Sequence, residues 1–154
     1  MKEIEDNGKI RIENLSKLLK YISEITLNKT ILAFRGEKKD YSKNKDGTNT
    51  ELHPFINRKN YLKNEDKIYR ESQRFNNQEF IEDKTTFDKL SRIQHYSAPT
   101  RLLDISEDLM SAVYFATEKK SDDQDSVLYI FEIQEDKVKY WDIKHHQRYF
   151  TRKS

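Results

Sequence analysis

Apolar residues recur at three- and four-residue spacing in three stretches of the chain, a spacing typical of amphipathic helices, and a fourth stretch has a few apolar residues on a charged background, which fits a helix with an exposed face. Asn14 and the Thr85–Asp88 pair have the residue types that cap helix starts. The most apolar of the four stretches is expected to begin at a cap on Ser106 or Asp104. The four predicted helices cover residues 14–27, 64–75, 85–96 and 107–119.

Three shorter runs are rich in β-branched and aromatic residues and predict strands: "TILAF" at 30–34, "SVLYIFEI" at 126–133 and "KVKYWDI" at 137–143. The last two follow each other closely, so they predict an antiparallel hairpin. Residues 38–60 show no period and predict a long loop. Together the elements predict an α+β fold, with a small, mainly antiparallel sheet packed with several helices, in a single domain over residues 1–154.

The composition favours a folded protein without thiol chemistry. Hydrophobic residues make up 34% of the chain, charged residues 36% and aromatic residues 12%, and the net charge is only +2. Cysteine is absent, which excludes disulfides and cysteine nucleophiles. No stretch has the ~20 consecutive apolar residues of a membrane span, and the charged start does not match a signal peptide. We therefore expect a cytoplasmic protein that binds no membrane.

The stretch "LAFRGE" places Arg35 and Gly36 at the end of the first predicted strand, although the chain has only three glycines. A guanidinium there suits a phosphate or a carboxylate, and glycine lets a ligand or another backbone approach closely. The alternative is structural: Arg35 pairs with a carboxylate, and Gly36 adopts a positive φ in a turn. The residues alone do not decide between these interpretations.

A second cluster, "QHYSAPTRLLD", carries six polar side chains in eleven residues, directly before the most apolar helix. Such side chains need partners or a cavity, because leaving them buried and unpaired costs about 1–3 kcal/mol each. One interpretation is a structural network in which Arg101 and Asp104 form a buried pair. The other is a site in which His95 transfers a proton and Arg101 holds an anion. The six residues are Gln94, His95, Tyr96, Thr100, Arg101 and Asp104.

Metal and nucleic-acid sites have weaker support in the sequence. His145 and His146 are adjacent, so on a helix they point about 100° apart, and His53 lies alone in the long loop. We expect no metal site. Residues 38–74 carry ten cations and six anions among several aromatic residues, a pattern that fits a nucleic-acid groove but is more typical of a solvated charged face.

With these residues in view, the chain resembles the FRG domain family, named for the Phe-Arg-Gly found here at Phe34 to Gly36. The family motif "Q-H-[YH]-G-x-P-T-R-L-L-D-W-[ST]" corresponds to "QHYSAPTRLLDIS", and its later "A-x-Y-F-A" corresponds to "AVYFA" in the last helix. The segment "LHPFINR" is similar to the family's "L-x-P-S-[LI]-x-R". The resemblance covers residues 15–133, while Ser97 replaces a usual glycine and Ile105 a common tryptophan.

The resemblance implies an occurrence in bacterial and phage proteins, some near defence or toxin systems, and hence an effector role. A strand followed by Arg-Gly is also similar to ADP-ribosyltransferase folds, where an arginine holds a phosphate of NAD and a later glutamate assists transfer. That analogy implies NAD as a cofactor and Glu132 as the acid. This chain has neither the Ser-Thr-Ser strand nor the Glu-x-Glu loop of that superfamily.

Two hypotheses follow, and a third has less support. In the first, Arg35 and Arg101 hold an anionic, nucleotide-type ligand such as NAD in a domain with ADP-ribosyltransferase-like activity. Its catalytic residues are His95, Tyr96 and Glu132, and its ligand-binding residues are Arg35, Gly36, Gln94, Thr100, Arg101 and Asp104.

In the second hypothesis the same residues form a buried polar network in a structural or protein-interaction module, and removing the Asp104 carboxylate unfolds the protein. The third is nucleic-acid binding through residues 38–74 and the basic tail. Residues 134–154 are expected to hold a hairpin strand and this tail, and the natural chain to continue further. The sequence does not predict an oligomeric state.

Overall fold

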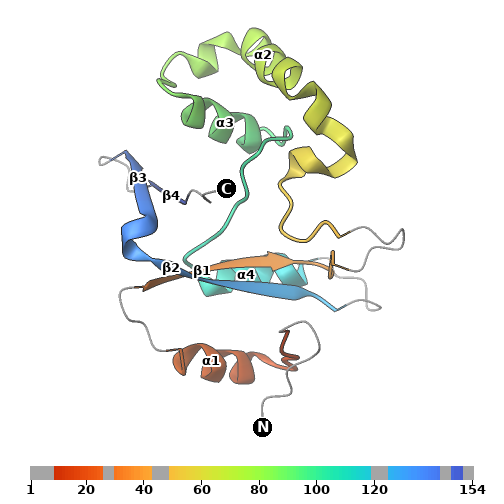
Figure 1. Ribbon diagram of the computed structural model, residues 1–154, viewed down its shortest axis with the longest axis vertical. Coiled ribbons are helices and arrows are strands. Elements are labelled where there is room, and N and C mark those ends of the chain that lie inside the picture. The colour runs from red at the N-terminus through yellow and green to blue at the C-terminus, as the bar shows by residue number, and fades with distance from the viewer. Residues whose placement is uncertain (1–8, 26–29, 43–48, 119–124, 143–146, 151–154) are drawn as a thin grey trace. The chain divides into compact units, whose positions relative to one another are not determined.

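A computed structural model describes residues 9–25, 30–42, 49–118, 125–142 and 147–150. The described residues form α-helices, 3-10 helices (η) and strands, which confirms the α+β class (Figure 1). In chain order the elements are α1 (Leu15–Ser23), β1 (Thr30–Glu37), η1 (Phe55–Asn64), α2 (Glu65–Phe75), η2 (Asn77–Phe80), α3 (Thr86–His95), α4 (Leu109–Thr117), β2 (Val127–Gln134), η3 (Glu135–Lys137), β3 (Val138–Asp142) and β4 (Gln147–Phe150).

The chain divides into two compact units. The larger unit runs from Ala33 to Phe131, and the smaller combines residues 1–32 with residues 132–154. Among the described residues, nearly all of the buried apolar side chains belong to the larger unit, including those of Phe34, Ile56 and Ile93. The prediction of a single domain over residues 1–154 stays a prediction.

The helix starts follow the predicted caps in two cases and differ in a third. The Asn14 side chain accepts a hydrogen bond from the Lys17 amide at the start of α1, and Thr85 and Asp88 form the expected capping box of α3. For α4, neither Ser106 nor Asp104 is the cap. Asp108 accepts from two amides of the first turn and from the Ser111 hydroxyl, and the Ser111 hydrogen bonds are the main cause that lowers the pKa of Asp108.

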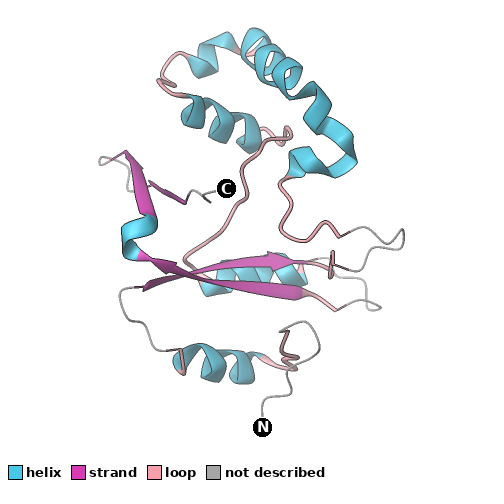
Figure 2. Cartoon of the chain, viewed as in Figure 1, coloured by secondary structure: helices cyan, strands magenta, loops and turns pink. Residues whose placement is uncertain are grey.

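β1 pairs with β2, and the arrowheads of the two strands lie at opposite ends (Figure 2). The predicted hairpin between the two late runs is therefore wrong. β2 is followed by η3, and β3 pairs with β4 in a separate antiparallel ribbon. Apolar alternation identified the late strands, but it carries no information about which strand a β-run pairs with.

The segment predicted as a loop over 38–60 is helical in its last part. η1 begins at Phe55, and Ile56 within it is 1% exposed. The Ile56 amide donates to the Thr100 carbonyl at 3.3 Å, so η1 is tied to the polar segment that follows α3. A 3-10 helix repeats every three residues, and the α-helical spacing used for prediction does not detect it.

Gly36 lies where the backbone of β1 meets the backbone of α4. A Cβ atom at this position would lie 1.8 Å from the Ala112 carbonyl oxygen and 2.8 Å from the Ala116 amide nitrogen. Ala112 and Ala116 are both buried, so small residues on both elements permit the contact. Figure 1 shows α4 against one face of the strand pair. Gly36 is part of the strand, and the proposed positive φ in a turn is not the reason for the glycine.

We predict that Gly36→Ala destabilises the protein by about 3 kcal/mol or more, because overpacking of a rigid contact typically costs 1–3 kcal/mol and here opposes two backbones. Urea unfolding followed by circular dichroism measures the change. Ala112→Gly, introduced as a second change, should give no rescue, because the colliding atom is the Ala112 backbone oxygen and not its methyl group. Recovery of wild-type stability in the double variant would contradict this assignment.

Candidate functional site

The two motif segments lie side by side in the larger unit. Phe34 of β1 and Ser106 exchange two backbone hydrogen bonds, at 2.6 and 2.8 Å. Next to this bridge, Nη1 of Arg35 donates to the Asp104 carbonyl oxygen at 2.7 Å. Thus β1 is paired with β2 and bridged to the segment between α3 and α4, and Arg35 reaches the end of the "QHYSAPTRLLD" motif.

Glu37 holds the guanidinium group of Arg35 from the other side. Arg35 and Glu37 are two residues apart on a strand and therefore share one face. Nε of Arg35 donates to Oε1 of Glu37 at 3.1 Å, and Nη2 of Arg58 donates to the same oxygen at 3.2 Å. The Glu37 side chain is only 3% exposed, whereas those of Arg35 and Arg58 are 19% and 26% exposed.

The second oxygen of this carboxylate, Oε2, is buried and has no hydrogen-bond partner among the described residues. A buried polar atom without a partner costs about 1–3 kcal/mol. The Tyr129 side chain lies near the same carboxylate. Its burial, together with the nearby charges of Glu37, Glu51 and Asp40, raises the pKa of the phenol well above its ordinary value. A neutral phenol thus adjoins an incompletely paired carboxylate.

Gln94 organises the segment that follows α3. Its amide group donates to a carboxylate oxygen of Asp104 at 2.5 Å, and its carbonyl oxygen accepts from the Thr100 hydroxyl. The Thr100 hydroxyl oxygen in turn accepts from the Leu102 amide at 3.1 Å, and Thr100 is 1% exposed. These contacts form a polar network with Gln94 at its centre.

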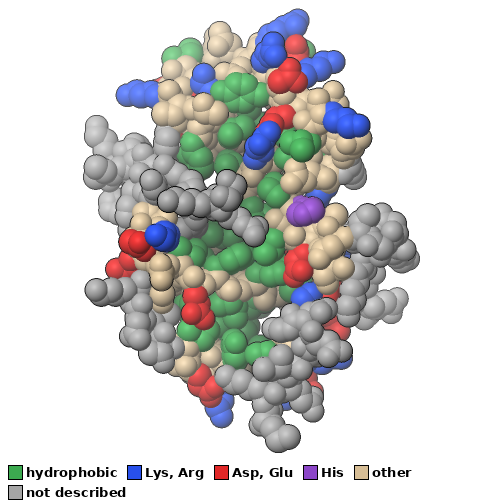
Figure 3. Space-filling model, viewed as in Figure 1, with side chains coloured by type: hydrophobic (Ala, Val, Ile, Leu, Met, Phe, Trp, Pro, Cys, Tyr) green, Lys and Arg blue, Asp and Glu red, His purple; other side chains and the backbone are tan. Residues whose placement is uncertain are grey.

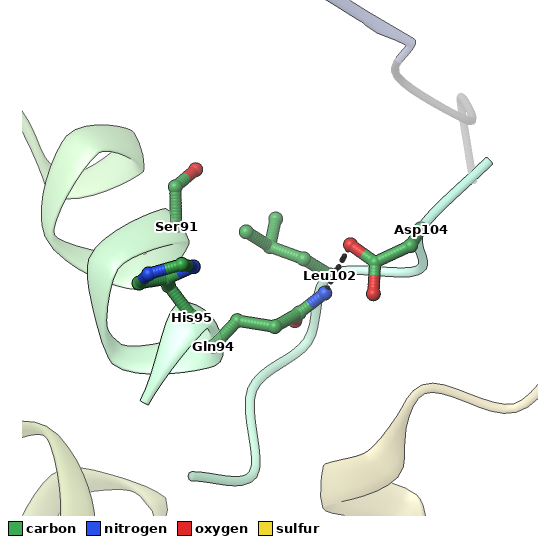
Figure 4. A pocket seen from close by; sticks show the side chains of 5 residues that line it. All are labelled: Ser91, Gln94, His95, Leu102 and Asp104. Carbon is green, nitrogen blue, oxygen red and sulfur yellow. Dashed lines mark hydrogen bonds between the residues drawn. The ribbon is translucent and has the colours of Figure 1, made fainter. Parts of the chain in front are cut away.

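A cavity of about 280 Å³ adjoins this network. In Figure 4, Ser91 and His95 of α3 face Leu102 and Asp104 of the following segment, and Gln94 reaches across to Asp104. Sequence reasoning missed Ser91 and Leu102. Ser91 precedes His95 by four residues and so shares its helix face, a signal that was available in the sequence.

Arg101 does not pair with Asp104, as the structural interpretation had expected. Its guanidinium forms a two-pronged pair with the Glu65 carboxylate at the start of α2, and this hydrogen-bonded pair raises the pKa of Arg101. The Arg101 side chain is 65% exposed. Asp104 is also exposed, and its carboxylate bonds Gln94. The expected buried Arg101–Asp104 pair is therefore wrong, and unfolding on loss of the Asp104 carboxylate is no longer expected, since an exposed group has water as an alternative partner.

A model of the FRG domain matches residues 30–125, which is more than half of the chain. The chain belongs to the FRG domain family. The matched region contains both motif segments and the cavity. It also contains Arg35, Glu37 and Arg58, which we call the Glu37 cluster. No curated protein and no solved structure matches the chain.

The remaining predicted residues of this FRG domain have different surroundings. His95 lines the cavity, and its ring centre lies 5.8 Å from that of Tyr96. The Tyr96 hydroxyl points to a different partner: it donates to Glu79 at 3.0 Å, and this hydrogen bond raises the pKa of Tyr96. Glu132 is exposed on β2 and belongs to the smaller unit. The catalytic roles of these three residues stay predictions, as does a ligand contact by Gly36.

Several described cations of the basic stretch over residues 38–74 pair with carboxylates, and Lys39 lies over the Tyr41 ring. Lys38 reaches Glu118 at 3.8 Å, Arg70 pairs with Asp66, and Arg74 pairs with Glu71. Acidic and basic side chains are intermixed over the α2 end of the molecule (Figure 3). This pattern fits a solvated charged face, and nucleic-acid binding stays a prediction.

The described residues offer neither a metal site nor a membrane span. They contain no group of three or more His, Asp or Glu side chains that could hold a metal ion, and no helix long and apolar enough to cross a membrane. His145 and His146 lie outside the described residues. His53 is described, and its backbone carbonyl accepts a hydrogen bond from Nε of Arg58 at 3.2 Å.

Ser97 explains why the family motif favours glycine at its fourth position. The Ser97 amide donates to the Gln94 carbonyl and the Ala98 amide to the Ile93 carbonyl, the two hydrogen bonds of a Schellman motif at the end of α3. The motif requires a left-handed residue, and Ser97 has a φ of 61°. This FRG domain therefore places a β-carbon where the backbone suits glycine.

We predict that Ser97→Gly stabilises the protein by about 0.5–1 kcal/mol, because relief of the left-handed strain exceeds the added freedom of the unfolded chain. Chemical denaturation measures the difference. Ser91→Gly, inside α3, is the matched control and should destabilise the protein, since glycine lowers helix stability by up to about 1 kcal/mol. The same sign for both substitutions would contradict the prediction.

Proposed function

We propose that this FRG domain binds an anionic, nucleotide-type ligand, with Arg35 holding the anionic group and the cavity beside α3 receiving the remainder. The proposal rests on Asp104, which joins the two places. Its carbonyl oxygen accepts from Arg35 at 2.7 Å, and its side chain lines the cavity. An anion on the guanidinium group would therefore have the cavity as its neighbour.

The chemistry of the cavity supports a ligand with more than an anionic group. Asp104 supplies carboxylate acceptors, and Ser91 and His95 supply groups that can donate or accept. Such a wall suits hydroxyl or amino groups and does not by itself attract an anion. A nucleotide combines phosphate with sugar hydroxyls and base amines, so it matches the guanidinium on one side and the acceptors on the other. The volume is just below the usual range for small-molecule sites.

Catalysis and the choice of NAD go beyond this proposal and stay predictions. His95 is the predicted catalytic residue whose side chain lines the cavity. Arg101 can contribute to binding only if its pair with Glu65 opens, because that pair uses both Nε and Nη2 of the guanidinium group.

A non-catalytic structural or protein-interaction module is the second candidate. Its support is the hydrogen-bond network of Gln94, Thr100 and Leu102 together with the Arg35–Asp104 contact, which ties β1 to the segment after α3. Both candidates use these contacts, and they differ in whether a small molecule binds. Ligand titration separates them.

We predict that a nucleotide panel containing ADP and NAD stabilises the wild-type domain in thermal-shift measurements, and that calorimetry gives a dissociation constant for the best member. Arg35→Gln should weaken that affinity roughly 10- to 100-fold, since hydrogen bonds to charged groups contribute about 1.5–3 kcal/mol. Adenosine, which lacks phosphate, should bind weakly to both proteins.

Arg74→Gln on α2 is the matched control, because Arg74 is 73% exposed and contacts Glu71 only loosely. Circular dichroism verifies that all variants are folded. If the wild-type domain binds no nucleotide, or if Arg35→Gln binds as tightly as Arg74→Gln, the proposal fails and the structural module is favoured.

A further inference from the structure

Arg58 donates to the same carboxylate as Arg35, and two other contacts also hold its guanidinium group. Its Nε donates to the His53 carbonyl at 3.2 Å, and its Nη2 donates to Oε1 of Glu37 at 3.2 Å. The centre of its guanidinium lies 5.0 Å from the centre of the Tyr41 ring. Arg58 belongs to η1 and Arg35 to β1, so two separate elements bring their guanidinium groups to one oxygen atom.

Two cationic groups of this cluster share one hydrogen-bonded carboxylate. Arg35 and Arg58 are both cationic, and Glu37 is the one carboxylate to which either donates among the described residues. Lys39 adds another cation, with its Nζ 4.8 Å from the centre of the Tyr41 ring. Like charges held this close repel each other unless an anion neutralises them. Two guanidinium groups thus share one carboxylate oxygen, and a ligand anion would supply a second acceptor for both.

Each guanidinium also keeps one Nη group that bonds no acceptor among the described residues. Arg35 uses Nε and Nη1, and Arg58 uses Nε and Nη2. Within the described part of the chain, no acceptor is bonded to Nη2 of Arg35 or to Nη1 of Arg58. Both side chains are partly exposed, at 19% and 26%, so solute can reach them while Glu37 stays buried.

We propose that Arg58, and not Arg101, is the second cation of the ligand site, and that Arg35 and Arg58 together clamp a phosphate group. The inference deepens the proposed nucleotide site and rests on it for the identity of the ligand. Glu37 is the positioning residue of the clamp. It orients both guanidinium groups and lowers their combined charge, so it limits the affinity for the anion.

Within the described residues, Arg101 neither shares a carboxylate with Arg35 nor contacts the Glu37 cluster. It faces a single carboxylate, Glu65, in a two-pronged pair whose charges cancel. No described contact links Arg101 to Glu37 or to Asp104. The sequence favoured Arg101 because it lies in the longest motif, whereas the structure places Arg58 against Arg35 through their shared oxygen atom.

Binding of orthophosphate and of ADP to the purified protein, at fixed pH and ionic strength, tests the clamp. Arg58→Gln should raise the dissociation constant of both probes about tenfold or more, because one charged donor set is lost. Arg58→Lys keeps the charge without the planar fork and should lie between Arg58→Gln and wild type. Arg101→Gln should bind within about twofold of wild type, since Arg101 bonds Glu65 and makes no described contact with the clamp.

Glu37→Gln provides a test that damage to the fold cannot imitate. Glutamine keeps an acceptor for both guanidinium groups and removes the negative charge, so phosphate should bind at least about threefold more tightly. In an Arg58→Gln background the same change should give a smaller gain. Circular dichroism confirms the fold of each variant.

The outcomes separate this inference from the proposed function. Binding of orthophosphate but not ADP, with loss in Arg58→Gln, supports the clamp and overturns the nucleotide proposal. Binding of ADP with equal affinity in wild type and Arg58→Gln overturns the clamp and leaves the proposed function standing. Weaker binding in Glu37→Gln, a larger loss in Arg101→Gln than in Arg58→Gln, or no binding of either probe by the wild type overturns the clamp.

Discussion

Gly36 brings the backbone of β1 against the backbone of α4, and the arrangement of the site depends on this contact. The Ala112 carbonyl fills the place that a side chain at residue 36 would need. The contact therefore fixes the strand at Gly36, and its two neighbours, Arg35 and Glu37, both belong to the Glu37 cluster. Gly36 lets β1 pack closely against α4, and its neighbours Arg35 and Glu37 supply charged groups to the site. This explains why a chain with three glycines has one at a strand end.

The sequence predicted elements better than it predicted partners. The helices and their Asn14 and Thr85 caps follow from local spacing and hydrogen bonding, and both local signals are confirmed. The pairing of the late strands was wrong because pairing depends on chain segments far apart in sequence. The proximity of Arg35 to the second motif was predicted and is confirmed by its bond to the Asp104 carbonyl. The composition of the site stays a prediction.

The Glu37 cluster shows why site composition was harder to predict. Glu37 lies one residue after the Phe-Arg-Gly segment and Arg58 at the end of "LHPFINR", so neither belongs to the motif richest in polar residues. In the sequence each is one of many charged residues, and charged residues make up 36% of the chain. Burial distinguishes Glu37, which as a whole residue is 5% exposed and is the buried charged residue of the described part of the chain.

Asp104 acts through two independent groups. Arg35 is anchored by the backbone carbonyl, while the carboxylate bonds Gln94 and lines the cavity. Every amino acid has that carbonyl, so replacement of the side chain at this position changes the cavity wall without removing the anchor of the arginine. In the proposed ligand site, substitutions at residue 104 would therefore alter the cavity wall while Arg35 keeps its anchor, because the main chain holds the arginine and the side chain lines the cavity.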